Sequence, residues 1–277
     1  MRLRQPARSV RQAIEKFAAR YSAWWRLMII LDSRNATRGT TRSSSGKLSN
    51  VTFILIPGAG GSAWYWHLVA PKLEQAGHEA VAVALPAGDD SAGLPEYTAA
   101  VIDAIGDRPP QRVVIVAQSL AGFTAPLVCK KVPPQLLVLV NAMIPKPGER
   151  PGEWWTNTHY KEAKRRQNQR DGRPADAPFD PLIDFFHDVP QTVVDAAWAQ
   201  GEPRQSDTVF GSPCNFETWP PVPTRVLVGR EDRFLPADFQ RRVARERLGI
   251  SADEMPGGHL VALSQPDEVA RRLIAYV

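Results

Sequence analysis

Three side chains of this sequence have the types and the chain order that nucleophilic catalysis needs: Ser119, Asp232 and His259. A serine hydroxyl is a weak nucleophile at neutral pH, so it requires a base within hydrogen-bond reach and an acid that orients the base. Taken singly, each residue has an ordinary interpretation as a helix N-cap, a turn residue or a loop histidine. Taken jointly, in this order and at predicted strand ends, they favour catalysis.

The segment around Ser119 has the layout of a nucleophile elbow, which is a tight turn from a strand into a helix. An apolar run at 113–116 stops at Ala117, and a helix-like stretch follows the serine. Such a turn lifts one side chain above the sheet edge and requires small residues on both sides. The usual pattern GxSxG is AxSxA here, with Ala117 and Ala121 in the places of glycine. From these residues alone, a serine that only caps the helix is an equally good interpretation.

The acid and the base lie in two loops late in the chain. Asp232 follows a predicted strand at 224–228 in the pattern GxxDxxxP, and open α/β sheets carry their sites at the carboxyl ends of strands. Its neighbour Glu231 competes for the same role, although the pattern favours Asp232. His259 lies in a glycine turn before the last predicted helix.

Acyl transfer also needs two backbone donors for the oxygen that becomes negative in the tetrahedral intermediate. The N–H of Leu120 directly follows the nucleophile at a helix N-terminus, where the dipole favours negative charge. The second donor is expected from the glycine turn after the first strand, with Ala59 as first choice and Gly60 as the reserve. A glycine-rich turn after a strand can also bind phosphate, but its spacing matches neither GxGxxG nor the Walker pattern.

Alternating strand and helix patterns carry these residues from position 51 onward. Short apolar runs predict strands at 51–56, 79–85, 112–117, 136–140 and 224–228. Helices are predicted at 64–75, 94–105, 120–131, 237–248 and 266–276. This alternation predicts an α/β fold with a mostly parallel sheet and helices on both faces.

Roughly eighty residues between two consecutive predicted strands interrupt the alternation. A loop of this length is rarely structureless, so we expect a helical cap at about 144–222, inserted between two late strands over the active site. The aromatic residues of the insertion either line an apolar pocket or only hold the insertion together: Trp154, Trp155, Tyr160, Phe179, Phe185, Phe186 and Trp198.

Residues 1–50 are predicted to be a basic, poorly ordered N-terminal extension, separate from a domain at 51–277. The extension carries eleven Lys and Arg residues against Glu15 and Asp32. Its apolar stretch at 24–31 is too short to span a bilayer, and no secretory signal pattern is present. A loosely ordered leader or a wrongly chosen start codon is one interpretation, and a basic amphipathic helix that rests on an anionic membrane is the other.

The net positive charge of the whole chain comes from this extension. The 277 residues have a net charge of +5, yet residues 51–277 hold 23 basic and 27 acidic groups. We therefore expect no nucleic-acid partner for the body, which has the size of one domain. Cys129 and Cys214 lie far apart without a metal-ligand pattern, so neither a disulfide nor a metal site is expected. This cysteine usage is compatible with a cytoplasmic setting.

These motifs, together with the stretch PGAGGSAWYWHLVAPKLEQAGHEAVAVALPAG at 57–88, resemble the α/β-hydrolase superfamily. More narrowly, they are similar to the small esterase and hydroxynitrile lyase group that includes plant methylesterases, and the likeness covers 51–277. The resemblance implies cofactor-free hydrolysis of a small, fairly apolar ester or lactone through an acyl-Ser119 intermediate.

Three departures from that group concern the site. Pro57 replaces a histidine that usually braces the oxyanion turn, and Gln118 precedes the nucleophile. Hydroxynitrile lyases of the group carry an active-site lysine, whereas Leu260 follows His259 here, so hydrolysis is favoured over lyase chemistry. The alternatives are a slow or non-catalytic ligand sensor on the same fold, a C–C bond hydrolase, or a hydroxynitrile lyase-like enzyme. The sequence fixes neither the substrate nor the oligomeric state.

Overall fold

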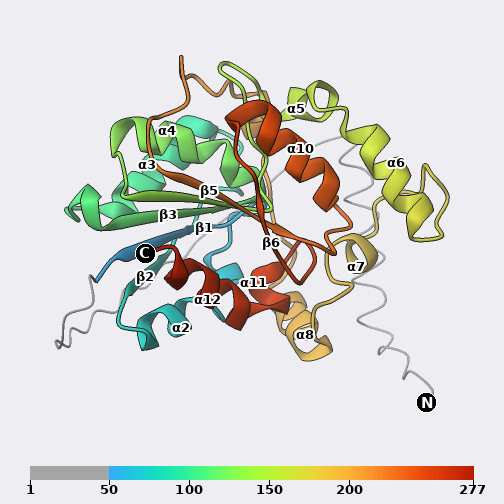
Figure 1. The fold of residues 1–277 in the computed structure, drawn as a ribbon, viewed down its shortest axis with the longest axis horizontal. Coiled ribbons are helices and arrows are strands. Elements are labelled where there is room, and N and C mark those ends of the chain that lie inside the picture. The colour runs from blue at the N-terminus through green and yellow to red at the C-terminus, as the bar shows by residue number, and fades with distance from the viewer. Residues whose placement is uncertain (1–49) are drawn as a thin grey trace.

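A six-stranded parallel sheet forms the centre of the molecule (Figure 1). The computed structural model describes residues 50–277. The sheet has the order β2-β1-β3-β4-β5-β6, and all five pairings are parallel. Its strands are β1 (Thr52–Ile56), β2 (Glu79–Ala82), β3 (Val113–Gln118), β4 (Leu136–Val140), β5 (Thr224–Gly229) and β6 (Asp253–Met255). The predicted α/β class is confirmed.

Helices cover both faces of this sheet, as predicted (Figure 1). One face carries α3 (Leu94–Ile105), α4 (Thr124–Lys131) and α10 (Ala237–Leu248), and the other carries α2 (Ala70–Gln75), α11 (Val261–Ser264) and α12 (Pro266–Ala275). Side chains alternate across a strand, so Ile54 and Ile56 enter one core while Phe53 and Leu55 enter the other. The two apolar cores hold the strand ends in fixed positions.

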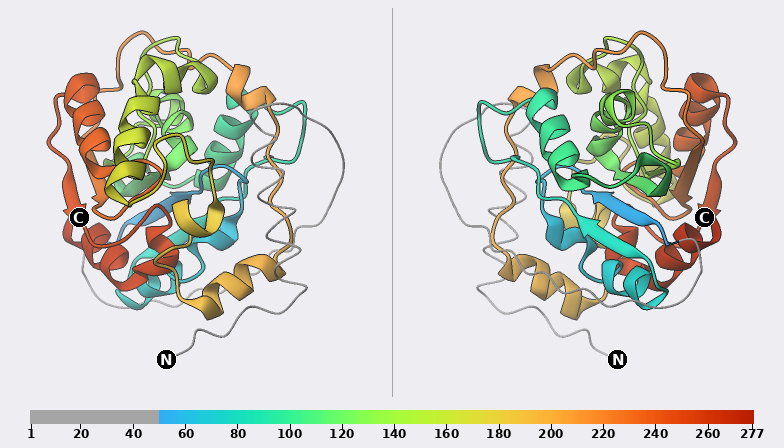
Figure 2. Two further views of the ribbon diagram at one scale, coloured as in Figure 1. Left: turned by 90° about the vertical axis from the view of Figure 1, so that its right-hand side faces the viewer. Right: turned by 90° about the vertical axis from the view of Figure 1, so that its left-hand side faces the viewer.

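Five helices lie between β4 and β5, in the stretch where a helical insertion was predicted. They are α5 (Pro151–Asn157), α6 (Tyr160–Arg170), α7 (Pro181–Asp184), α8 (Gln191–Ala199) and α9 (Thr208–Gly211). Figure 1 shows α6, α7 and α8 along the right-hand side of the view, and the left panel of Figure 2 shows them facing the viewer.

Some element boundaries differ from the predicted ones. The helix expected at 64–75 is a 3-10 turn, η1 (Ala63–Trp66), followed by α2, which begins beside Pro71 because proline is favourable in a first helical turn. The strand expected at 79–85 ends at Ala82, and the chain then turns so that Leu85 N donates to Gly61 O at 2.9 Å. Strand β6 was not predicted, because its three residues include two acids and show no apolar run.

The predicted N-terminal extension at 1–50 lies outside the described residues except for Asn50. Within residues 50–277, no helix has both the length and the apolar character that a membrane crossing requires.

Candidate active site

Ser119 lies where β3 turns into the 3-10 helix η3 (Ser119–Gly122), and its backbone is in the left-handed region with φ at 52°. A non-glycine residue adopts this conformation only where its surroundings impose it. Contacts with Met143 hold the turn in this conformation. Met143 N donates to Ser119 O at 2.9 Å, and a Cβ on Gly122 would overlap the Met143 carbonyl. The glycine that this elbow needs is therefore Gly122, and the alanine positions on either side of the serine are compatible with the turn.

The imidazole of His259 lies between Ser119 and Asp232. Its Nε2 is 3.0 Å from Ser119 Oγ, and its Nδ1 is 2.8 Å from Asp232 Oδ2. All three residues are buried. They follow the carboxyl ends of β3, β5 and β6, which meet at one edge of the parallel sheet. The structure thus brings together the three residues that the sequence singled out.

Four donors surround the buried carboxylate of Asp232. Oδ1 accepts hydrogen bonds from the N–H groups of Phe234 (2.9 Å) and Leu235 (2.8 Å), and Oδ2 accepts one from Gln240 Nε2 (3.0 Å) besides its contact with His259. Burial of a carboxylate is costly unless its oxygens find such partners. The orientation of the oxygen that faces His259 is therefore fixed by the loop and by α10.

Glu231, the competing acid, makes a different contact. Its Oε2 accepts a hydrogen bond from Gly257 N at 2.6 Å, and its own N–H donates to Gly257 O at 3.1 Å. Glu231 therefore holds the glycine turn that carries His259, whereas Asp232 contacts the imidazole itself.

Asn141 is a site residue that the sequence analysis missed. It is fully buried at the end of β4, with φ at 44°, and its Nδ2 donates to the carbonyls of Gly258 (2.9 Å) and His259 (3.1 Å). Its Oδ1 accepts from Gly229 N at 2.8 Å. The available signal was a polar residue directly after the apolar run at 136–140. Asn141 tethers the histidine loop to the ends of β4 and β5.

Replacing Asn141 by glycine is expected to lower the free energy of unfolding by about 2 to 5 kcal/mol, because three buried backbone groups lose their partners. Glycine accepts the positive φ, so Asn141→Ala should cost about 1 to 2 kcal/mol more. Urea unfolding measures both values, and kcat/KM should fall in both variants. Wild-type stability in Asn141→Gly would show that the tether is dispensable.

Two backbone N–H groups are the candidates for the predicted oxyanion hole. Leu120 is the second residue of η3, and the first amides of a helix have no partner within it. The turn after β1 lies directly against the serine, because a Cβ on Gly58 would be 2.8 Å from Ser119 Cβ. Gly60 N, the reserve choice, donates to Gln205 Oε1 at 2.9 Å, while Ala59 N has no partner among the described residues. Of the two turn amides, Ala59 is the one left available.

Gln118, one of the departures from the resembled group, is buried against the base. Its Nε2 lies 3.4 Å from both the Nε2 and the carbonyl oxygen of His259. The side chain thus packs beside the imidazole without displacing the shorter contact to Ser119.

Aromatic side chains enclose the imidazole of His259. The ring of Phe185, which follows α7, stacks on it with centroids 5.0 Å apart and an interplanar angle of 15°. Phe234 meets it edge-on at 4.9 Å. Among the insertion aromatics, Phe179 and Trp155 contact Phe234, so these rings form one cluster beside the histidine.

Buried ion pairs hold the insertion together, and one of their members also contacts the loop that carries Asp232. Asp184 is fully buried and binds Lys164 Nζ at 2.5 Å and Arg173 Nη1 at 3.0 Å. Lys164 also donates to the carbonyl of Arg233 at 2.7 Å. Removing one partner of such a pair leaves an uncompensated buried charge. The ion pairs therefore favour one packing arrangement of the insertion.

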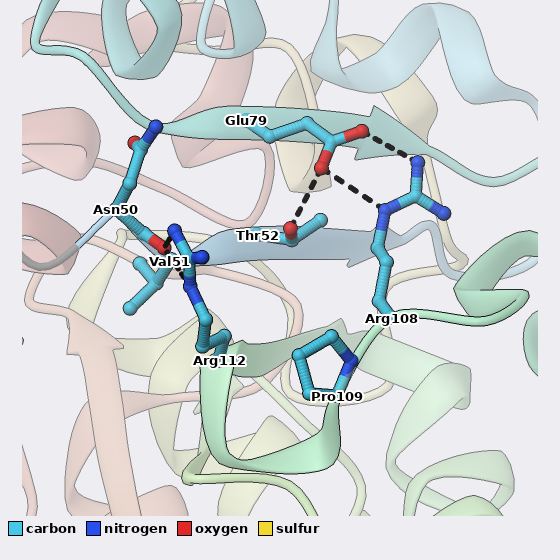
Figure 3. Close-up of a pocket in the computed structure, with 7 residues that line it drawn as sticks. All are labelled: Asn50, Val51, Thr52, Glu79, Arg108, Pro109 and Arg112. Atoms are coloured by element: carbon cyan, nitrogen blue, oxygen red, sulfur yellow. Dashed lines mark hydrogen bonds and ion pairs between the residues drawn. The ribbon is translucent and has the colours of Figure 1, made fainter. Parts of the chain in front are cut away.

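A cavity of about 160 Å³ lies where β1 and β2 begin, at the opposite end of the strands from Ser119 (Figure 3). Its charged lining is internally paired. Glu79 binds Arg108 Nε at 3.0 Å and Thr52 Oγ1 at 2.8 Å, and Arg112 Nε donates to Asn50 O at 2.7 Å. Because these groups satisfy one another and lie away from Ser119, we assign the cavity no part in the site.

The fold and this arrangement define a class of protein. A family model described as the alpha/beta hydrolase family matches residues 53–272, and the chain belongs to that family. The resemblance stated from the sequence is thereby confirmed.

Similarity to individual proteins points to plant esterases. The chain is 34% identical over 110 residues to a probable esterase, PIR7A, of Oryza sativa subsp. indica, covering 36% of this chain and 42% of the relative. It is 30% identical over 105 residues to polyneuridine aldehyde esterase of Rauvolfia serpentina, covering 34% of this chain and 40% of the relative. The chain thus matches about two fifths of the length of these curated relatives.

Solved structures share the fold over most of the described chain. The crystal structure of polyneuridine aldehyde esterase superposes with a TM-score of 0.66 at 22% identity, covering 82% of this chain and 99% of that one. A pyrethroid hydrolase from Sphingobium faniae JZ-2 gives 0.62 at 20% identity, covering 82% and 96%. At these identities the likeness establishes the fold alone. The chemistry is inferred from the residues of the site.

Proposed function

We propose that this chain is a serine hydrolase that cleaves a small, fairly apolar carboxylic ester or lactone. Ser119 is the nucleophile, His259 the base and Asp232 the acid that orients the base. The observation that carries the proposal is the continuous path of short contacts, 3.0 Å from serine to imidazole and 2.8 Å from imidazole to carboxylate. The relatives named as esterases support the same reaction class.

The first half of the reaction forms the acyl-enzyme. An ionised carboxylate only accepts hydrogen bonds, so Asp232 holds the His259 tautomer that carries its proton on Nδ1 and a lone pair on Nε2. Nε2 takes the proton of Ser119 as Oγ attacks the ester carbonyl. The tetrahedral intermediate then collapses, the C–O bond to the alcohol breaks, and His259 returns the proton to the departing oxygen.

The second half releases the acid. Water gives a proton to His259 Nε2 and attacks the acyl carbon, and the second tetrahedral intermediate returns Ser119 with its proton. In both intermediates the N–H groups of Leu120 and Ala59 stabilise the oxyanion. Loss of one such donor typically lowers turnover about 100-fold to 1,000-fold.

The proposal also covers the setting of the site. Residues 51–277 act as one hydrolase domain, and the helices within 144–222 form a cap whose Phe185 covers His259. The partner is a small-molecule ester, with no cofactor. The proposed location is the cytoplasm, since the two cysteines, Cys129 and Cys214, are unpaired and buried.

A panel of nitrophenyl esters with increasing acyl length tests the reaction class. We expect steady turnover of short-chain esters, with kcat/KM falling once the acyl chain outgrows the capped site. Failure of the folded protein to hydrolyse any member of the panel would contradict esterase activity and favour a sensor or a non-ester acyl transfer.

A further inference from the structure

The connection between α8 and α9 lies against the glycine turn after β1. Gly60 N donates to Gln205 Oε1 at 2.9 Å, and a Cβ on Gly60 would be 3.1 Å from the Cβ of Pro203. The same connection is fastened to the loop after β2, because Ser206 N donates to Ala87 O at 2.6 Å. Figure 2 shows this orange segment running along the side of the molecule beside the blue-green loops.

Gln205 is held from its other side by α3. Its Nε2 donates to the hydroxyl of Tyr97 at 2.8 Å and to Ser206 O at 3.0 Å. Burial raises the pKa of Tyr97 to about 12, so the hydroxyl is neutral at physiological pH and accepts this bond without becoming charged. With its nitrogen fixed in this way, the amide oxygen of Gln205 points at Gly60.

The hydrogen bond from Gly60 acts on the middle of a tight turn. Gly61 N donates to Gly58 O at 3.1 Å, which closes a four-residue turn, and Gly60 has φ at +88°. A positive φ at the third position defines a type II turn, and type I differs from it by a flip of the central peptide. That central peptide joins Ala59 to Gly60, and its N–H is the one that Gln205 accepts. Gln205 thus selects one of two orientations of the turn.

We propose that Gln205 is a positioning residue for the oxyanion hole, supplied by the capping segment rather than by the core. The inference rests on the proposed function, in which Ala59 N is the oxyanion donor of the turn that lies against Ser119. Residue 57 is a proline, which has no side-chain donor or acceptor, so the turn depends on a brace from elsewhere. Movement of the segment at 201–208 and stabilisation of the oxyanion are therefore linked.

Substitution of Gln205 by methionine removes all three side-chain hydrogen bonds and keeps the length of the side chain. Arg204→Met is the matched control, because Arg204 is its exposed neighbour on the same segment. Three quantities are measured: kcat and KM for the best nitrophenyl ester, the inhibition constant of a trifluoromethyl ketone with the same acyl group, and amide hydrogen exchange of a peptide spanning 56–66. The ketone forms a tetrahedral adduct and reports oxyanion stabilisation directly.

We expect Gln205→Met to lower kcat by about 10-fold to 100-fold with little change in KM, since small misplacements at a reacting centre cost up to about 100-fold. Affinity for the ketone should fall by a similar factor, and exchange in the turn should rise. Tyr97→Phe should give a smaller loss of kcat, and the double variant should be no worse than Gln205→Met alone, because Tyr97 acts through Gln205.

A loss confined to KM, an unchanged ketone affinity or unchanged exchange in the turn would overturn the role of Gln205. If the wild-type protein neither hydrolyses esters nor binds the ketone, the proposed function fails and the oxyanion role fails with it. Hydrogen exchange separates the two failures, because it reports whether Gln205 orders the turn whatever the chemistry is.

Discussion

Replacement of Ser119 by alanine is expected to lower kcat for ester hydrolysis by about 10⁴-fold to 10⁶-fold, and His259→Ala should cause a loss of the same size. Nucleophile and base act as a unit, since Oγ is reactive only while Nε2, 3.0 Å away, accepts its proton. The double variant should therefore be no slower than either single one. Steady-state kinetics at saturating substrate measure kcat, and circular dichroism checks the fold.

Matched controls for this pair come from the same edge of the sheet. Ser62 is an exposed serine that caps η1, and His67 stacks on Trp64 without reaching Ser119. Ser62→Ala and His67→Ala should keep turnover close to that of the wild type. Losses that multiply in the Ser119 and His259 double variant would indicate that the two residues act independently, against the proposed chemistry.

The second large effect concerns the choice between two adjacent acids. We expect Asp232→Asn to lower kcat by about 10⁴-fold. The N–H groups of Phe234 and Leu235 both donate to Oδ1, so an asparagine oxygen would take that place and its NH₂ would face His259 Nδ1. The imidazole would then carry its proton on Nε2 and could not accept the one from serine.

Glu231→Gln is the matched comparison, because it changes the neighbouring residue in the same way. Glu231 binds Gly257 N and not the imidazole, so its loss should reduce kcat far less than that of Asp232. Measured kcat/KM and urea unfolding of both variants distinguish chemistry from loosening of the loop. Equal losses of activity in the two variants would show that Asp232 has no special role.

Local patterns predicted the elements that position the nucleophile and the acid. The helices at 94–105 and 237–248 have the predicted bounds, because each combines a clear apolar face with a proline near its start. The nucleophile elbow could be recognised because a short apolar strand ends abruptly in small residues. Strand β6 could not be recognised in this way. Asp253, Glu254 and Met255 have no strand pattern of their own, and they form a strand because they pair with β5.

Contacts between distant segments lay beyond the sequence patterns. Asn141 reaches the histidine loop across 118 positions, and Gln205 reaches Gly60 across 145. The local sequence shows at most that Asn141 is a polar residue after an apolar run, and it indicates neither contact, because the partners of an amide side chain are set by what the fold brings to it. The oxyanion turn was predicted from its glycines, while its brace became visible only once the capping segment was placed beside it.

Intact-mass analysis after treatment with a fluorophosphonate, followed by peptide mapping, is the most direct measurement of whether this site activates a serine. We expect a single phosphonyl adduct on Ser119 in the folded protein, formed slowly or not at all in His259→Ala and absent from Ser119→Ala. A folded wild-type protein that stays unlabelled, or that carries the adduct on another residue, would contradict the hydrolase assignment.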